Sequence, residues 1–332
     1  AGGGGILTFI PNIFILFLAL AVLEDSGYMS RVAYVMDSVM GRVGLSGKAF
    51  LPMILGFGCT VPAIMATRAL ETEHDRRKTM LVTPFMSCSA RLPIYVLFSE
   101  MFFPKTPALA AFSMYVIGMG TAILVALAVN GLEKGRINDS LLIELPEYKR
   151  PNARTIRIYV WNKLKDYLEK AGTTIFIASI VILFVLNFGI SGQVSDPSDS
   201  FGAMIGRFLV PVLAPAGLGM WQIGVALVSG ISAKEVVVSS FAVLFGVANA
   251  NSDAGMAAIV SNIQSINPAF GPLNAYCLML FCLLYVPCTA TVATIRKESG
   301  SWKFTMGMIV FQVLLAWLAA VAVFQVGSLF AA

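Results

Sequence analysis

Long apolar stretches alternate with short polar segments along most of this sequence. Runs of about 20 apolar residues are long enough to span the hydrocarbon core of a bilayer as a helix. The pattern therefore predicts an all-α fold: a polytopic helical membrane protein with about six transmembrane spans, two re-entrant hairpins and interfacial helices. Uninterrupted spans are expected at 6–23, 108–132, 171–190 and 303–330.

Four other apolar stretches are interrupted near their middle, at 49–70, 79–103, 218–246 and 273–295. The interruptions are the segments Gly56-Phe57-Gly58-Cys59, Ser87-Cys88-Ser89, Ser229-Gly230-Ile231-Ser232 and Pro287-Cys288-Thr289. Glycine and proline inside a helix cost roughly 1 and 3 kcal/mol, so a lipid-facing span would not normally carry them together. Irregular backbone at membrane depth is tolerated where it is buried in protein or lines a cavity. We therefore expect the breaks to line a pore or a substrate site.

The same order of parts occurs twice, which is typical of transporters built from internal repeats. In each repeat a span is followed by an interfacial helix, a hairpin, a broken span and a second span. The first repeat covers 1–132, with its interfacial helix at 28–40, its hairpin at 49–70 and its broken span at 79–103. The second repeat covers 171–332, with its interfacial helix at 201–217, its hairpin at 218–246 and its broken span at 273–295.

The distribution of basic residues indicates that the two repeats are inverted. If 49–70 and 218–246 enter and leave the membrane on one side, Arg91 and Lys234 lie within the membrane and only Lys105 and Arg207 fall outside. A model in which every apolar stretch crosses fully would place several more Lys and Arg residues outside. Cytoplasmic segments carry the excess of Lys and Arg, so the hairpin topology is favoured.

Composition agrees with a membrane protein, since 58% of the 332 residues are hydrophobic and 12% are charged. All five cysteines lie in apolar stretches, which argues against a disulfide framework. The net charge of +5 comes largely from a cytoplasmic linker at 133–170 with nine Lys or Arg residues, and it does not indicate nucleic-acid binding. We expect a basic amphipathic helix at 154–170, with Trp161, Leu164 and Leu168 on its apolar side.

Cys59, Cys88 and Cys288 each lie directly at a break, beside small hydroxyl residues. Thiolates suit borderline and soft metals such as Fe(II), Zn(II) and Cu(I). We therefore expect these three cysteines to contribute to a metal site together with Glu235. Further pore or hairpin residues at the breaks are Gly56, Gly58, Thr60, Ser87, Ser89, Ser232 and Thr289. The alternative is that the cysteines only pack, as we expect for Cys277 and Cys282.

Charged residues at membrane depth are costly and usually functional. Glu235 follows Lys234 in the later hairpin and is a candidate ligand or proton-coupled group. A structural alternative is a buried ion pair with Lys234, or a cap on the second limb of the hairpin. Arg91 is expected to bind carbonyl groups freed by its break. No catalytic residue is predicted, so the chain is expected to be a transporter rather than an enzyme.

Four segments resemble the membrane region of the FeoB-type bacterial ferrous iron transporters: ALAVLEDSGYMSRVAYVMD, LPMILGFGCTVPAIMATRALE, TPFMSCSARLPIYVLF and SGISAKEVVVSSFAVLF. The resemblance implies two Gate modules and uptake of Fe2+ across the bacterial inner membrane. It also implies that the site cysteines of that family correspond to Cys59, Cys88 and Cys288, and its glutamate to Glu235. Thr60 departs from the family, which usually has Asn there.

The resemblance also implies partners. They are Fe2+ as the transported substrate, the lipid bilayer, a GTPase domain upstream, a small cytoplasmic accessory protein and a second copy of the chain. No phosphate-binding G-x-x-x-x-G-K-[ST] motif occurs in the sequence, and no cofactor is expected to be bound. Two alternatives remain open. One is a Gate-type carrier of an organic solute such as a nucleoside, and the other is a membrane scaffold whose segment 133–170 docks a soluble partner.

Overall fold

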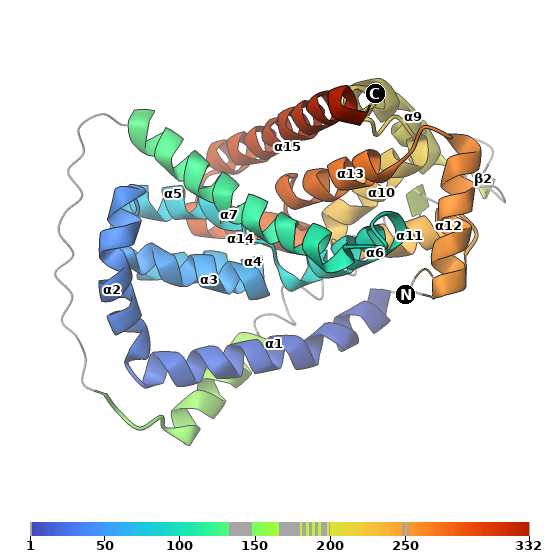
Figure 1. Cartoon of the computed structure of the whole chain (residues 1–332). Coiled ribbons are helices and arrows are strands. Elements are labelled where there is room, and N and C mark those ends of the chain that lie inside the picture. The colour runs from blue at the N-terminus through green and yellow to red at the C-terminus, as the bar shows by residue number, and fades with distance from the viewer. Residues whose placement is uncertain are drawn as a thin grey trace. The chain divides into compact units, whose positions relative to one another are not determined.

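Helices make up nearly all of the described structure, as the cartoon in Figure 1 shows. The computed structural model describes residues 2–132, 148–165, 180, 184–185, 188–189, 192–193, 198, 200–247, 250 and 252–331. The only strands in these parts of the chain are β1 (Phe188–Gly189) and β2 (Gly192–Gln193), which pair antiparallel. The predicted all-α class is confirmed. Most of the expected span 171–190 lies outside the described residues, and Phe188–Gly189 at its end form a strand.

The helices of the first half of the chain begin at its N-terminus and are interrupted as the sequence indicates. They are α1 (Gly2–Asp25), α2 (Tyr28–Arg42), η1 (Gly47–Ala49), α3 (Phe50–Gly58), α4 (Thr60–Ala66), η2 (Thr67–Ala69), α5 (Glu73–Val82), η3 (Thr83–Phe85), η4 (Ser89–Arg91), α6 (Leu92–Phe102) and α7 (Pro107–Leu132). The second half contains α9 (Phe201–Leu213), η6 (Ala214–Ala216), α10 (Trp221–Ser232), α11 (Val236–Leu244), α12 (Asp253–Ile266), α13 (Pro272–Leu284), α14 (Thr289–Ser299) and α15 (Trp302–Ala331).

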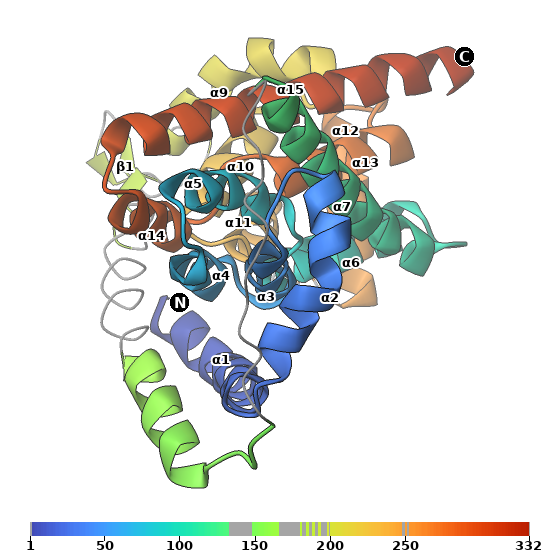
Figure 2. The same ribbon diagram turned by 90° about the vertical axis from the view of Figure 1, so that its left-hand side faces the viewer.

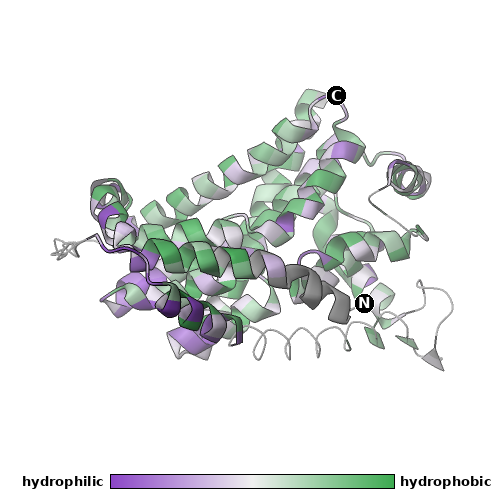
Figure 3. Ribbon diagram, turned by 90° about the horizontal axis from the view of Figure 1, so that it is seen from below, coloured by the Kyte–Doolittle hydropathy of each residue, from purple (hydrophilic) through white to green (hydrophobic). Residues whose placement is uncertain are grey.

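Four helical segments of the described chain are long and apolar enough to cross a membrane: Glu73–Phe102, Pro107–Leu132, Pro272–Ser299 and Trp302–Phe330. A fifth is obtained if α9 with η6 and α10, which meet at an angle of 102°, are counted as one bent span. Hydrophobic residues predominate along the helices (Figure 3). The chain is therefore a helical membrane protein, while the count of six spans with two re-entrant hairpins stays a prediction.

The chain divides into two compact units, and two of the limits between them fall at breaks. The first unit consists of Ala1–Cys88, Met119–Ile177 and Ala290–Ser301, and the second of Ser89–Gly118, Ala178–Thr289 and Trp302–Ala332. The boundaries after Cys88 and after Thr289 coincide with the interruptions of the two broken spans. The two limbs of each broken span therefore belong to different units, and the units cut across the predicted repeats 1–132 and 171–332. The repeat organisation stays a prediction.

In the first unit, the first hairpin stretch is broken at a single residue. Cys59 is extended (φ −151°, ψ 130°) between α3 and α4, which pack against each other (Figure 2). Helix α3 runs through Gly56 and Gly58, although both were expected to belong to the break. Gly56 has a packing role instead, because a Cβ at this position would lie 2.8 Å from Cβ of Met86. The glycine lets the hairpin approach the second break closely.

The polar segment from Glu71 to Lys78, which joins the first two interrupted stretches, is helical for most of its length. Helix α5 already begins at Glu73, and the Thr72 hydroxyl accepts a hydrogen bond from the backbone N–H of Asp75 at 3.1 Å. Glu73 and Asp75 lie in the first turn, where the helix dipole favours acidic groups. The capping signal was present in the sequence, but the high charge of the segment concealed it.

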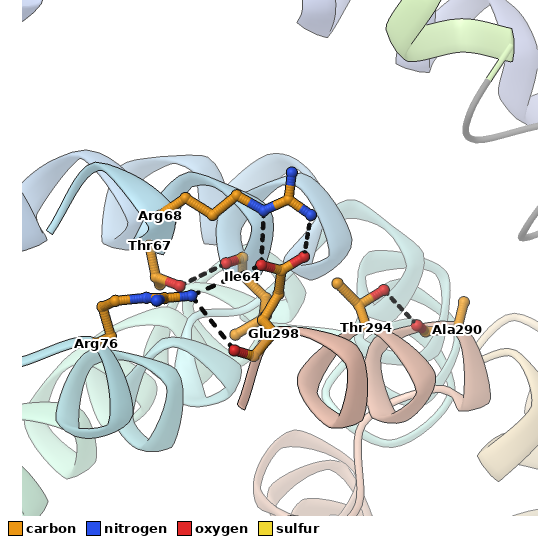
Figure 4. A network of polar contacts seen from close by, with 7 residues as sticks. All are labelled: Ile64, Thr67, Arg68, Arg76, Ala290, Thr294 and Glu298. Carbon is orange, nitrogen blue, oxygen red and sulfur yellow. Dashed lines mark hydrogen bonds and ion pairs between the residues drawn. The ribbon is translucent and has the colours of Figure 1, made fainter. Parts of the chain in front are cut away.

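A buried carboxylate ties α14 to this part of the first unit (Figure 4). The side chain of Glu298 is 4% exposed and receives two hydrogen bonds from Arg68, of which the one from Nε is 2.6 Å long. Arg76 of α5 lies 3.8 Å from the same carboxylate and donates to the Glu298 carbonyl oxygen at 3.3 Å. Bidentate pairing with arginine fixes orientation as well as charge. The contact joins segments more than 200 residues apart in sequence.

The basic linker contains the expected helix, which the structure describes from 153 to 165, but its apolar side differs. Ile156 and Val160 are buried in a cluster with α1, α3 and α4, and Leu164 packs at its edge. Trp161 is 66% exposed and is not part of this cluster, and Leu168 lies outside the described residues. The residues that pack, Ile156, Val160 and Leu164, have a spacing of four and so share one face of the helix. The assignment of Trp161 to the apolar side stays a prediction.

The acidic end of α1 holds the same helix in place. The Asp25 carboxylate accepts a hydrogen bond of 2.6 Å from the backbone N–H of Asn152. Burial, together with the neighbouring Glu24 carboxylate, raises the pKa of Tyr159 to about 12. Glu24 and Asp25 therefore anchor the helix at 153–165 to α1.

In the second unit, small residues allow close helix packing. A Cβ on Gly206 of α9 would lie 2.5 Å from the Trp221 carbonyl oxygen, and one on Gly224 would lie 3.1 Å from the backbone of Gly206. Helix α12 was not predicted, although Ser252 caps it through a hydrogen bond of 3.1 Å from the backbone N–H of Gly255. Its short apolar face, Ile259 and Ile263, gave a weaker signal than the membrane-length stretches.

The packing role of Gly56 predicts a contrast between two glycine-to-alanine substitutions. Gly56→Ala should destabilise the protein, because overpacking costs roughly 1–3 kcal/mol and outweighs a helix-propensity gain of about 1 kcal/mol. Gly120→Ala in α7 is the control, since nothing lies within 4 Å of its added methyl group. This variant should be as stable as the wild type or more stable. Thermal unfolding of both purified variants in the same detergent measures the difference, and equal melting temperatures would contradict the packing role.

Candidate functional site

Two helix breaks meet in the second unit. The first, Ala233–Glu235, separates α10 from α11, and the second, Tyr285–Cys288, separates α13 from α14. Lys234 is 2% exposed, and its Nζ donates a hydrogen bond to the backbone oxygen of Val286. The same ammonium lies 3.2 Å from the centre of the Tyr285 ring. A charge at this depth is thus held by a carbonyl freed by the break and by an aromatic face.

Two further hydrogen bonds join the same breaks. The Tyr285 hydroxyl donates to the Leu227 carbonyl oxygen at 3.2 Å, and the Thr289 hydroxyl donates to the Ser232 carbonyl oxygen at 3.2 Å. The Ser232 carbonyl is the last of α10 and has no intrahelical partner, whereas the Leu227 carbonyl lies about one turn inside the helix. Ser232 in turn donates its hydroxyl to the Ser229 carbonyl oxygen at 2.7 Å. The broken backbone is therefore satisfied from inside the protein.

The break in the second hairpin falls later than expected. The sequence indicated Ser229–Ser232, but α10 continues through these residues and the backbone becomes extended at Ala233 (φ −155°, ψ 137°). Gly230 is required by packing, because a Cβ there would lie 2.5 Å from the Tyr285 hydroxyl oxygen. The glycine makes room for the tyrosine and does not interrupt the helix.

Glu235 has neither of the structural roles considered for it. Its side chain does not cap α11, and among the described residues its carboxylate has no ion-pair partner, because Lys234 binds Val286 instead. Glu235 is partly buried at the beginning of α11. An acidic group in this position remains available to a cation.

The three cysteines at breaks differ from the other two in exposure. Cys59, Cys88 and Cys288 are partly exposed, whereas Cys277 and Cys282 are buried in α13. Cys277 also donates a weak hydrogen bond to the Ala320 carbonyl oxygen at 3.7 Å, which agrees with the packing role expected for it. The break cysteines are thus the accessible ones.

The predicted site residues are distributed over both units. Gly56, Gly58, Cys59, Thr60, Ser87 and Cys88 lie in the first unit, and Ser89, Ser232, Glu235, Cys288 and Thr289 lie in the second. Thr60 and Ser87 are buried. In the described part of the chain no three His, Cys, Asp or Glu side chains are grouped closely enough to hold a metal ion. The convergence of the three cysteines on one cavity stays a prediction.

Arg91 and Tyr285 are two large polar side chains that are buried at the breaks. Arg91 is 1% exposed at the beginning of α6, which agrees with a role at the break, and it has bonded partners. Tyr285 was missed, because an aromatic residue in an apolar segment looks like ordinary packing. The Pro-Cys pair that follows it was the available signal of a break.

An open cavity of about 710 Å³ lies elsewhere in this unit, between α6 and α12, and includes none of the predicted site residues.

Comparison with known proteins identifies the family. The family model named Gate, described as "Nucleoside recognition", matches residues 6–102 and 168–302. The chain belongs to the Gate family. A second family model, "Ferrous iron transport protein B C terminus", matches residues 111–163, between the two Gate segments. No solved structure matches the chain.

The curated relatives carry the name expected from the sequence. The chain is 44% identical to the Fe(2+) transporter FeoB of Staphylococcus aureus over 99% of its own length and 48% of the relative. It is 39% identical to FeoB of Methanocaldococcus jannaschii over 99% of its length and 49% of the relative. The chain is 38% identical to a fusion of Fe(2+) transport protein A with FeoB from Porphyromonas gingivalis, over 99% of its own length and 44% of the relative. The resemblance to FeoB-type proteins is confirmed, and this Gate chain spans about half the length of these relatives.

The contacts between the two breaks predict a measurable effect of one hydroxyl group. Tyr285→Phe keeps the ring that faces Lys234 but removes the hydrogen bond to Leu227, and should lower the free energy of unfolding by roughly 0.5–1.5 kcal/mol. Tyr34→Phe, at a side chain that is 59% exposed, serves as the control and should have no effect. Thermal unfolding in detergent compares the two. Equal stability of both variants would show that this bond does not help to hold the breaks together.

Proposed function

We propose that this Gate chain is the membrane-permease part of a FeoB-like system and moves Fe2+ across a membrane. The observation that carries the proposal is the Glu235 carboxylate, which has no ion-pair partner among the described residues and lies at a helix break. The names of the relatives from Staphylococcus aureus and Methanocaldococcus jannaschii support the choice of ferrous iron. These relatives are named transporters, and we propose no catalytic role for the chain.

The proposed ligand set combines an oxygen anion with thiols. Glu235 would supply a carboxylate, and Cys59, Cys88 and Cys288 would supply sulfur during passage, a combination suited to a borderline cation such as Fe2+. Carbonyl and hydroxyl oxygens at the breaks would complete the coordination. Gly56, Gly58, Thr60, Ser87, Ser89, Ser232 and Thr289 are the residues proposed there. A hydroxyl that donates to a carbonyl, as Thr289 does, still has lone pairs for a cation.

The proposed setting is a multi-pass protein of the bacterial inner membrane, built from two inverted Gate repeats. We propose a GTPase domain upstream as a partner, since the chain spans about half of its relatives. The fusion protein of Porphyromonas gingivalis supports a small accessory protein as a second partner. A homo-oligomer remains a further proposal. Fe2+ is treated as substrate, and no bound cofactor is proposed.

A second candidate function is transport of an organic solute such as a nucleoside. The description of the Gate family as nucleoside recognition favours it. In that case hydroxyl groups and half-helix N–H groups would bind the solute, and the cysteines would only pack. Uridine is therefore included in the uptake experiment below.

The first functional prediction concerns the charge of Glu235. Protein reconstituted in proteoliposomes should take up Fe2+ under reducing conditions. Glu235→Gln should reduce the uptake rate about 10-fold or more. Mutation of a residue that only supports a metal ligand typically lowers activity by about 10-fold to 100-fold, and loss of a ligand itself should have at least this effect. Glu71→Gln, at an exposed residue paired with Lys48, is the matched control and should transport normally. Normal uptake by Glu235→Gln would remove this residue from the metal path, and uptake of uridine without Fe2+ would favour the second function.

The second functional prediction concerns the thiols. Ser replaces Cys with little change in volume, so separate Ser variants of Cys59, Cys88 and Cys288 should lower Fe2+ uptake and shift the preference towards the harder ion Mn2+. Cys277→Ser is the control, because a hydroxyl can still donate to the Ala320 carbonyl oxygen. Competition of Mn2+ with Fe2+ uptake measures the shift. Unchanged selectivity in all three variants would assign the break cysteines to packing.

A further inference from the structure

A buried amide without a partner lies on the last helix of the chain. Gln312 of α15 is 0% exposed, and neither its Nε2 nor its Oε1 has a hydrogen-bond partner among the described residues. Buried amide groups are normally paired, because an unsatisfied donor or acceptor costs stability. Polar side chains inside membrane helices usually mark a functional pathway. Gln312 therefore requires an explanation that packing alone does not provide.

The buried face of α15 shows what Gln312 lies against. Its fully or nearly fully buried residues recur every three or four positions: Thr305, Met308, Gln312, Ala316 and Ala320. The face that these residues form packs along α13, the main neighbour of α15 in the second unit (Figure 1). Many of the other positions of α15 are exposed apolar residues, as expected for a lipid-facing helix. The single carboxamide on this stripe thus lies on the protein side.

The register of α13 and α15 places Gln312 at the level of the beginning of the second break. The helices run antiparallel, because Leu273 meets Gly327, where an added Cβ would lie 2.5 Å from the leucine, and Cys277 donates to the Ala320 carbonyl oxygen. Eight residues back from Ala320 is Gln312, and eight residues forward from Cys277 is Tyr285. At equal rise per residue the two positions lie at the same level. Tyr285 is the first residue of the Tyr285–Cys288 break.

We propose that the Gln312 carboxamide is a further ligand of the transported divalent cation, which its oxygen coordinates as the ion passes the Tyr285–Cys288 break. The proposal rests on the proposed function, because the ion is the cargo of the permease. A carboxamide oxygen is a neutral ligand that suits divalent cations. It would add an oxygen ligand without a second negative charge, and it explains why an amide without a partner is present in this helix.

The proposal predicts opposite effects of one substitution on stability and on transport. Gln312→Leu removes two unsatisfied polar atoms, so its melting temperature in metal-free detergent should equal or exceed that of the wild type. Its Fe2+ uptake in proteoliposomes should nevertheless fall about 10-fold to 100-fold, as expected for a residue that supports a metal site. The rise in melting temperature that Fe2+ produces in the wild type should be lost.

Gln325→Leu is the matched control on the same helix. The Gln325 amide donates to the Pro215 carbonyl oxygen at 3.3 Å, so this variant loses a hydrogen bond but no proposed ligand, and it should keep normal uptake. Normal uptake by Gln312→Leu would overturn the proposal. A fall in uptake together with a lower melting temperature would overturn it too, because it would show a structural role. Failure of the proposed function is recognised separately, in the wild type, by the absence of Fe2+ uptake.

Discussion

Backbone carbonyl groups released by a helix break must find donors inside the protein, because the hydrocarbon core of a membrane offers none. In the second unit this constraint determines which side chains surround the breaks. Lys234 donates to Val286, Tyr285 to Leu227 and Thr289 to Ser232. The buried ammonium of Lys234 and the hydroxyl of Thr289 thus satisfy carbonyl groups that lipid could not satisfy. Since Lys234 is bound to Val286, Glu235 has no ion-pair partner among the described residues, and its carboxylate is the acidic group on which the proposed function depends.

Close packing of the segments around the breaks is the second requirement, and it explains why glycine is needed at two positions inside helices. Gly56 and Gly230 both stand inside helices, at positions where a methyl group would strike Met86 or the Tyr285 hydroxyl. From sequence alone each looked like part of a break, because glycine lowers helix propensity in either case. The contact that requires Gly230 lies more than 50 residues away along the chain. Local sequence could therefore locate the interrupted stretch but not the interrupted residue.

Features with strong local causes were predictable. The membrane-length apolar runs predicted α7 and α15, and Pro287 with Cys288 predicted the end of α13, because proline and a loss of periodicity act on neighbouring residues. Tertiary contacts decided the remaining features. The sequence indicated the helix at 154–170, but only the cluster around α1 shows that Ile156 and Val160 are its buried residues.

The candidate site likewise contains residues that could be predicted from the sequence and residues that could not. Glu235 and the break cysteines could be selected because charge and thiol groups beside helix-breaking residues are unusual at membrane depth. The Pro287-Cys288 pair marked the break after Tyr285, but nothing in the sequence around Tyr285 shows that its hydroxyl would reach α10. Gln312 did carry a signal, as a lone amide in an apolar span, but its significance depends on the register between α13 and α15.

The breaks are also places where the chain passes from one compact unit to the other. The chain passes from one unit to the other after Cys88 and after Thr289, at the same residues that carry the candidate ligands. Thr289 is held to Ser232, and Val286 is held to Lys234, so the crossing point near Cys288 is fixed by the contacts that satisfy the broken backbone. On the far side of this crossing, Glu298 binds Arg68 and Arg76 and anchors α14 within the first unit. Cys288 lies between Val286 and Thr289, so the contacts that satisfy the broken backbone also fix the position of a proposed ligand.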